Sequence, residues 1–267
     1  MMPDASPVDL PAALGMPVFD VGPLAALYRP MEAGAWRLTV GGSVLCPGYP
    51  DGVKLVQGVI ALVRGNETWM SLTPIECESQ ILGVAAAEGH VVIMGLGMGW
   101  VAAETALRAE VLQVTIVERD PDVIAIHRAL DLFAQLPGGA GEKVRIVEAS
   151  AYDWRPDQPV DLLMPDIWLG LIEGDRVPEV RRMQDNVGAR AIYFWGQELE
   201  IARHAAAAGR RLDAAGVAAT VRDFALPLVM PEDIDYPTFV QAAARQWMRG
   251  RWFAPEHAAI LEPAPPA

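Results

Sequence analysis

Short apolar runs alternate with longer amphipathic stretches through the middle of the chain. The apolar runs have the length of buried strands, and the stretches between them show the 3.6-residue period of helices. Strands are predicted at 90–95, 112–118, 143–148, 160–165 and 190–195. Helices are predicted at 73–87, 99–110, 121–135, 177–186 and 197–214, followed by a strand at 217–223 and a helix within 231–253. This alternation predicts an α/β fold with a doubly wound, mostly parallel sheet.

The first part of the chain has a different pattern, in which short apolar runs are separated by turn signals. Residues 59–63 and 68–72 flank Gly65-Asn66 and predict a β-hairpin within a small β-rich module. Thr73-Pro74-Ile75-Glu76 then predicts a helix that starts with a capping box. We expect three parts: an N-terminal arm and β-hairpin module at 1–72, an α/β domain at 73–230, and a C-terminal helix with a disordered tail at 231–267.

Composition narrows the function classes. The 267 residues are 52% hydrophobic, yet no apolar run reaches the ~18 residues that a membrane span needs, and no basic region precedes an apolar core near the N-terminus. Two cysteines in no disulfide or metal-binding pattern fit a reducing cytoplasm. A net charge of −13 disfavours nucleic acid as a partner, because phosphates require a basic face. We therefore expect a cytoplasmic protein that binds neither membranes nor nucleic acids.

The run from His90 to Trp100 carries the most chemical information. An apolar strand ends in Gly95-Leu96-Gly97-Met98-Gly99, and a helical pattern follows at once. Glycines allow positive φ and close approach of a ligand, and the free N–H groups of the following helix point to the same place. The dinucleotide fingerprint would place its third glycine at Trp100, so NAD and FAD are disfavoured.

A second strand, Val114 to Val117, ends in Glu118-Arg119. An acid at this place in an α/β sheet can accept both hydroxyls of a ribose. Asp120-Pro121 then predicts a capped helix start. We predict that Glu118 binds the ribose of a nucleoside ligand, with Arg119 beside it.

Ligands in such sheets bind at the carboxyl ends of the strands, so the residues after the other strands are further candidates. Ser150 and Ala151 stand where an adenine edge would lie, and Asp153 is a second candidate for the adenine amino group. Asp166 could take a proton from a nucleophile or bind an amine, and an ordinary loop or cap acid is the other interpretation. Trp168 and Trp195 could wall the pocket and stabilise a cation through their ring faces, or be plain core.

Other chemistries find little support. We recognise no metal-ligand spacing around the four histidines, so no metal site is expected. Neither a Gly-x-Ser-x-Gly motif nor a P-loop occurs, which disfavours hydrolases and kinases.

Residues 90–168 resemble the S-adenosylmethionine (SAM)-dependent methyltransferase superfamily, and within it the spermidine synthase-like branch. The resemblance lies in three segments: Val91-Val92-Ile93-Met94-Gly95, Val114-Thr115-Ile116-Val117-Glu118-Arg119-Asp120-Pro121, and Val160-Asp161-Leu162-Leu163-Met164-Pro165-Asp166. It implies a Rossmann-like fold, with SAM bound at the glycine turn and Asp166 facing the substrate. The chain departs from the polyamine synthases at Met98, where they carry Asp, and at Ala149-Ser150-Ala151, where they carry Gly-Asp-Ala.

The sequence therefore predicts a SAM-dependent transferase, in the simplest case a methyltransferase acting on a small molecule, with Asp166 as the catalytic residue. Two alternatives stay open: a polyamine aminopropyltransferase that uses decarboxylated SAM, and a non-catalytic SAM-fold binding protein. A homodimer is the assembly we consider.

Overall fold

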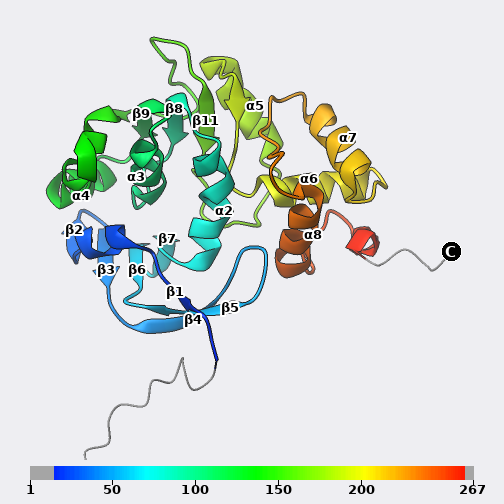
Figure 1. Ribbon diagram of the computed structural model, residues 1–267, viewed down its shortest axis with the longest axis horizontal. Helices are drawn as coiled ribbons and strands as arrows, with labels where there is room; N and C mark the ends of the chain where they lie inside the picture. Colours follow the sequence, from blue (N-terminus) through cyan, green and yellow to red (C-terminus); the bar gives the residue numbers. More distant parts are fainter. Residues whose placement is uncertain (1–14, 262–267) are drawn as a thin grey trace, which may run out of the picture.

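A five-stranded parallel sheet forms the centre of the computed structural model, which describes residues 15–261 (Figure 1). Its strand order is β10-β9-β8-β11-β12. The strands are β8 (Gly89–Met94), β9 (Val111–Glu118), β10 (Val144–Glu148), β11 (Leu162–Pro165) and β12 (Ala191–Ile192). In register, Met94 pairs with Val117 on one side and with Pro165 on the other. Glu118 and Asp166 therefore flank the first glycine of the turn at the same sheet edge.

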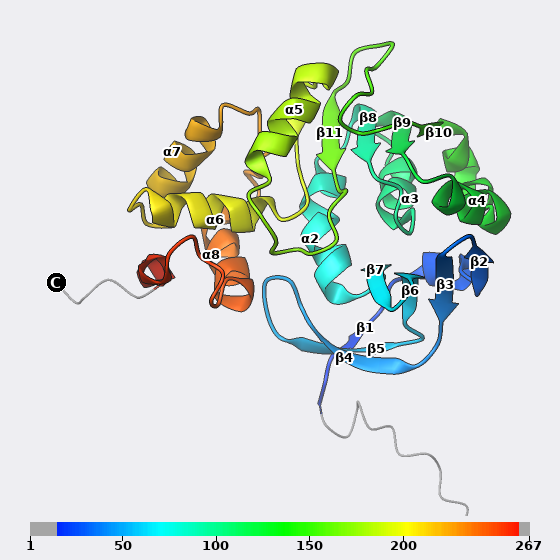
Figure 2. The ribbon, with the colours of Figure 1, turned by 180° about the vertical axis from the view of Figure 1, so that it is seen from behind.

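Helices cover both faces of this sheet (Figures 1 and 2). Along β8 the side chains alternate: Val91 and Ile93 pack into one buried cluster, and Val92 and Met94 pack into another. Both clusters are almost closed to solvent, as a doubly wound sheet requires. The helices are α2 (Pro74–Ala85), α3 (Trp100–Leu107), α4 (Pro121–Leu130), α5 (Val177–Val187), α6 (Gln197–Ala207), α7 (Ala214–Phe224) and α8 (Tyr236–Trp247), with 3₁₀ turns at Pro23–Leu27, Phe133–Gln135, Pro137–Lys143 and Pro255–Leu261.

Two antiparallel-rich sheets precede the α/β part, as the turn-rich pattern predicts. The four-stranded one has the order β2-β3-β6-β7, and the three-stranded one has the order β1-β5-β4. Their strands are β1 (Val18–Phe19), β2 (Met31–Ala33), β3 (Trp36–Val40), β4 (Ser43–Pro47), β5 (Val53–Gln57), β6 (Ile60–Arg64) and β7 (Glu67–Ser71). The predicted hairpin is β6–β7, which pairs antiparallel around Gly65.

The N-terminal strands lie beyond the carboxyl ends of the parallel strands (Figure 2). Trp36, Leu38 and Leu62 belong to the same buried cluster as Val91 and Ile116. A shared core fixes the position of these strands over the end of the sheet where ligands bind in such folds.

The α/β class and the β-rich beginning are confirmed, but several elements differ from the prediction. Residues 217–223 belong to α7 and are not a strand. Asp213 caps this helix by accepting the N–H of Gly216, and Val217, Val221 and Phe224 form a buried stripe at helical spacing. The predicted helix 197–214 ends at Ala207, and the helix within 231–253 is limited to α8.

The predicted capping box is also absent. Thr73 occupies the N-cap of α2 without a side-chain cap bond, and its hydroxyl instead bonds that of Ser71 at 3.0 Å. Among residues 15–261, no helix combines the length and the apolar character needed to cross a bilayer. The predicted arm up to residue 14 and the tail from 262 lie outside the described residues.

Candidate cofactor and acceptor site

A cavity of about 560 Å³ lies between the carboxyl edge of the parallel sheet and the N-terminal strands. Most of the residues predicted from the sequence line it: Gly95, Leu96, Gly97, Glu118, Arg119, Ser150, Ala151, Asp166 and Trp168. Four predicted residues do not: Met98, Gly99, Asp153 and Trp195. The topology thus brings four strand ends together at one cavity, as parallel strands do.

The glycine turn follows β8 and requires glycine for two separate reasons. All three glycines have positive φ, which is 100° at Gly95 and 49° at Gly97. A Cβ on Gly95 would lie 2.1 Å from the carbonyl oxygen of Asp166, and one on Gly97 would lie 2.2 Å from Sδ of Met70. The turn is therefore pressed between the β11 end and the N-terminal strand β7, with no room for a side chain.

The carbonyl groups of Gly97 and Met98 accept hydrogen bonds from side chains that do not line the cavity. The Nε2–H of His127 donates to the Gly97 carbonyl at 2.9 Å, and the Tyr28 hydroxyl donates to the Met98 carbonyl at 2.8 Å. Burial lowers the pKa of His127 to about 4, so its ring is neutral at pH 7, and the carbonyl partner places its proton on Nε2. The Met98 side chain is fully buried. Met98 and Gly99 thus belong to the turn but do not line the cavity.

Glu118 is oriented by two backbone groups. Its Oε2 accepts the N–H of Leu96 at 3.0 Å, and its Oε1 accepts the N–H of Asp120 at 2.8 Å. A carboxylate oxygen has two lone-pair positions, so each oxygen retains one acceptor position. The carboxylate lines the cavity, and it can accept two more hydrogen bonds from a ligand there.

The N-terminal strands supply a wall of the cavity that the sequence did not reveal. Trp36, Arg64, Trp69 and Met70 line it. The Trp36 indole donates to Oδ2 of Asp120 at 2.8 Å, its ring meets Trp69 edge-on at 5.4 Å, and the Arg64 guanidinium lies 5.3 Å from its centre. A hairpin carrying Trp and Arg was the available signal, but nothing local indicated that it would fold over the glycine turn.

The loop after β10 contributes Ser150, Ala151 and Tyr152. The Ser150 hydroxyl accepts the Tyr152 N–H at 3.2 Å, which tightens the loop. Asp153 turns outward to an exposed ion pair with Arg182 and is not among the cavity residues. Of the two adenine-binding candidates after this strand, the structure therefore places Ser150, and not Asp153, at the cavity.

Asp166 reaches the cavity from the end of β11. Its Oδ2 accepts the side-chain amide of Gln80 at 2.8 Å. Burial raises the pKa of Asp166 to about 7, although Arg176 and Gln80 oppose this shift. Burial and the neighbouring Asp166 carboxyl also raise the pKa of Glu76 well above its usual range. A carboxyl that titrates near neutral pH can act as a general base or acid.

The two predicted tryptophans have different positions. Trp168 lines the cavity, and its indole donates to Glu179 at 2.6 Å. Trp195 is almost fully buried, and its indole donates to the Ser79 hydroxyl at 2.8 Å. The buried Arg176 guanidinium lies between them, 4.7 Å from the Trp168 ring centre and 5.0 Å from that of Trp195. Both rings thus contact a cation, but this cation belongs to the protein.

Besides the N-terminal wall, the sequence did not predict Gln80, Glu76 and Arg176 at the site. Gln80 and Glu76 lie one turn apart on α2, far from the β11 end in sequence, and Arg176 lies in the loop that follows Asp166. The spacing of Glu76 and Gln80 placed them on one helix face, but it did not indicate which face met Asp166.

No protein-family model and no curated protein matches this sequence. Solved structures match part of it. A putative RNA methyltransferase from Pyrococcus horikoshii is 16% identical, with a TM-score of 0.34, over 46% of this chain and 57% of that chain. The glycopeptide N-methyltransferase MtfA, complexed with S-adenosyl-L-homocysteine, is 17% identical, with a TM-score of 0.34, over 42% of this chain and 43% of that chain. Spermidine synthase from Thermotoga maritima is 12% identical, with a TM-score of 0.37, over 60% of this chain and 53% of that chain. The matched part spans less than two thirds of each of these proteins, so the ligand of this chain must be inferred from its own cavity.

Proposed function

We propose that the cavity binds SAM and that the protein is a SAM-dependent methyltransferase with a small-molecule acceptor. The observation that carries this proposal is the position of Glu118, which faces the cavity next to a glycine turn with two acceptor positions free. Two adjacent ribose hydroxyls match this pair of acceptors. The glycine turn lets the ligand come close to the protein backbone, because no Cβ lies in the way.

The rest of the cavity fits the remaining parts of the cofactor and an acceptor. Ser150 and Ala151 lie on the Glu118 side, where the base of a nucleoside would lie. Asp166 and Trp168 lie beyond the first glycine, on the side where a sulfonium and an acceptor would meet. Asp166 would orient the acceptor or remove its proton, and proximity of nucleophile and methyl carbon would supply most of the rate.

One observation favours a second candidate, aminopropyl transfer from decarboxylated SAM. The Asp166 carboxyl is close enough to Glu76 to raise the pKa of Glu76, and two neighbouring carboxyl groups also suit a cationic amine. This reading shares the nucleoside contacts of the first proposal and differs only in the group transferred.

Calorimetric titration of the purified full-length protein with SAM, and separately with decarboxylated SAM, tests both candidates. Micromolar binding of SAM with weaker binding of the decarboxylated form supports methyl transfer and justifies an acceptor screen. The reverse preference supports aminopropyl transfer. Binding of neither ligand contradicts the proposal and leaves a non-catalytic binding fold.

A further inference from the structure

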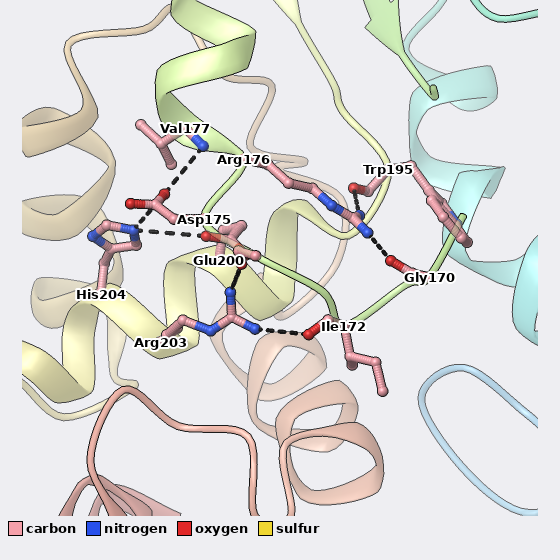
Figure 3. Close-up of polar contacts among 10 residues, drawn as sticks. Gly170, Ile172, Asp175, Arg176, Val177, Trp195, Glu200, Arg203 and His204 are labelled. Atoms are coloured by element: carbon pink, nitrogen blue, oxygen red, sulfur yellow. Dashed lines mark hydrogen bonds and ion pairs between the residues drawn. The ribbon is translucent and has the colours of Figure 1, made fainter. Parts of the chain in front are cut away.

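A cluster of three potential ligands lies where the loop before α5 meets α6 (Figure 3). None of the three lines the cavity. Glu200 and His204 are four residues apart on α6 and therefore share one helix face, and Asp175 approaches them from the loop. We propose that Asp175, Glu200 and His204 bind a divalent first-row transition-metal ion. This inference is independent of the proposed function.

The separations of the ligand atoms suit one shared ion. His204 Nε2 lies 3.2 Å from Asp175 Oδ1 and 3.6 Å from Glu200 Oε2, and all three ligand atoms lie within 4.8 Å of one another. Around a tetrahedral zinc ion with metal–ligand distances of about 2.1 Å, neighbouring ligand atoms are about 3.4 Å apart. Two of the three separations therefore already bracket the value for a bound ion.

A buried oxygen without a hydrogen bond gives an independent reason to expect an ion. The Glu200 side chain is only 3% exposed. Its Oε1 accepts a hydrogen bond from Arg203 Nη1 at 2.6 Å. Its Oε2 faces His204 Nε2 at 3.6 Å and has no hydrogen-bond partner within residues 15–261. A buried polar atom without a partner costs about 1–3 kcal/mol, and an unseen ion is one of its recognised explanations. A cation bound to Oε2 would remove this cost.

Charge and ring orientation agree with a cation. Arg203 pairs with one of the two carboxylates, so these three side chains together keep one negative charge beside the His204 ring. The imidazole is held edge-on by Phe224 at 4.9 Å and Phe253 at 5.2 Å, with Nε2 directed to the carboxylates. One imidazole nitrogen with two carboxylates suits zinc, manganese or iron better than magnesium or calcium, which prefer oxygen alone.

A bound ion would fix the loop on α6. Asp175 directly precedes Arg176, whose guanidinium lies between Trp168 and Trp195 and donates to the Trp195 carbonyl. The same loop places Trp168 at the cavity. The metal would thus stabilise the loop that forms one wall of the cavity without entering the cavity itself.

Zn²⁺ alone is the probe for the test. The full-length protein, freed of metal with a chelator, is titrated by calorimetry and melted with and without Zn²⁺. We expect one ion per chain and a higher Tm with Zn²⁺. His204→Gln and Asp175→Asn should each lower the affinity at least about tenfold, whereas His257→Gln, which changes a histidine outside the cluster, should leave it unchanged.

Asp175 is a surface side chain, 39% exposed, so Asp175→Asn keeps the proposal testable if His204→Gln fails to fold. Circular dichroism of each variant checks the fold. The proposal is overturned if the wild type binds no Zn²⁺ stoichiometrically, which would leave the cluster as an ion-pair network. It is also overturned if Asp175→Asn binds Zn²⁺ as tightly as the wild type, because the ion would then lie elsewhere.

Discussion

Glu118 and Asp166 occupy equivalent positions in the parallel sheet, but their surroundings give them different chemistry. Each stands one residue beyond a partner of Met94, on opposite sides of the glycine turn. Glu118 accepts two backbone N–H groups and lines the open cavity. Asp166 accepts one side-chain amide and has Glu76 nearby. The comparison shows how one strand end can orient a carboxylate through backbone N–H groups, whereas burial at the neighbouring strand end raises the pKa of another carboxyl.

Among the substitutions predicted here, removal of the Asp166 carboxyl should have the largest effect, and it tests the catalytic side of the comparison. If Asp166 acts as the base, Asp166→Asn should lower kcat about 100-fold or more, with the Kd for SAM within about threefold of the wild type. The pKa near 7 implies that the wild-type rate rises with pH and levels off above neutrality, because only the ionised form accepts a proton. Steady-state assays on an acceptor found by screening, together with calorimetry, measure both quantities. An unchanged kcat would show that Asp166 is only a binding residue.

The glycine turn between the two acids gives the next largest effect. Gly97→Ala places a Cβ 2.2 Å from Met70 Sδ at a φ of 49°, so the turn or the β7 strand must shift. We expect the affinity for SAM to fall about tenfold and the protein to lose about 1–3 kcal/mol of stability.

Gly138→Ala is the matched control for this substitution. Gly138 has a φ of 65°, but no atom of the described part of the chain lies within 4 Å of its Cβ position. This variant should lose about 1 kcal/mol through backbone strain alone and bind SAM as the wild type does. Equal SAM affinities for the two variants would contradict the close packing of the turn against Met70.

The smallest expected effect is on stability, and it tests whether Asp166 binds a proton more tightly in the folded protein. The pKa of Asp166 is about 7 in the folded protein and near 3.8 when unfolded, so the folded state binds the proton more tightly. The contribution of this carboxyl to the free energy of unfolding is fully present below about pH 4 and is lost as the pH rises through 7. Asp166→Asn does not titrate at this position, so the stability of this variant minus that of the wild type should be about 1–2 kcal/mol larger at pH 8 than at pH 6. Urea unfolding at the two pH values tests this; an identical difference at both would show that the carboxyl is not protonated in the folded state.

Local sequence signals were sufficient for the half of the site that a continuous segment builds. The glycine turn and Glu118 come from one β-turn-α-β unit, whose apolar runs, glycines and Asp120-Pro121 cap all act over short distances. The prediction of a strand at 217–223 was wrong, because its apolar residues also form a helical stripe and Asp213 caps the helix.

The other half of the cavity depends on contacts between distant segments. Trp36 reaches Asp120 across 84 positions, and Gln80 reaches Asp166 across 86. No spacing rule links such pairs, because the tertiary fold alone brings them together. The sequence predicted no metal site, because the four-residue spacing of Glu200 and His204 alone does not define one and only the structure brings Asp175 to the pair.

The most direct measurement of the central claim is the affinity for SAM of Glu118→Ala compared with Glu148→Ala. Glu148 ends the neighbouring strand in register with Glu118 but is exposed and does not line the cavity. Loss of two hydrogen bonds to a charged acceptor, each worth about 1.5–3 kcal/mol, should weaken SAM binding by Glu118→Ala at least about 100-fold, and Glu148→Ala should bind SAM as the wild type does. An affinity of Glu118→Ala within about twofold of the wild type would contradict the assignment of Glu118 to the ribose.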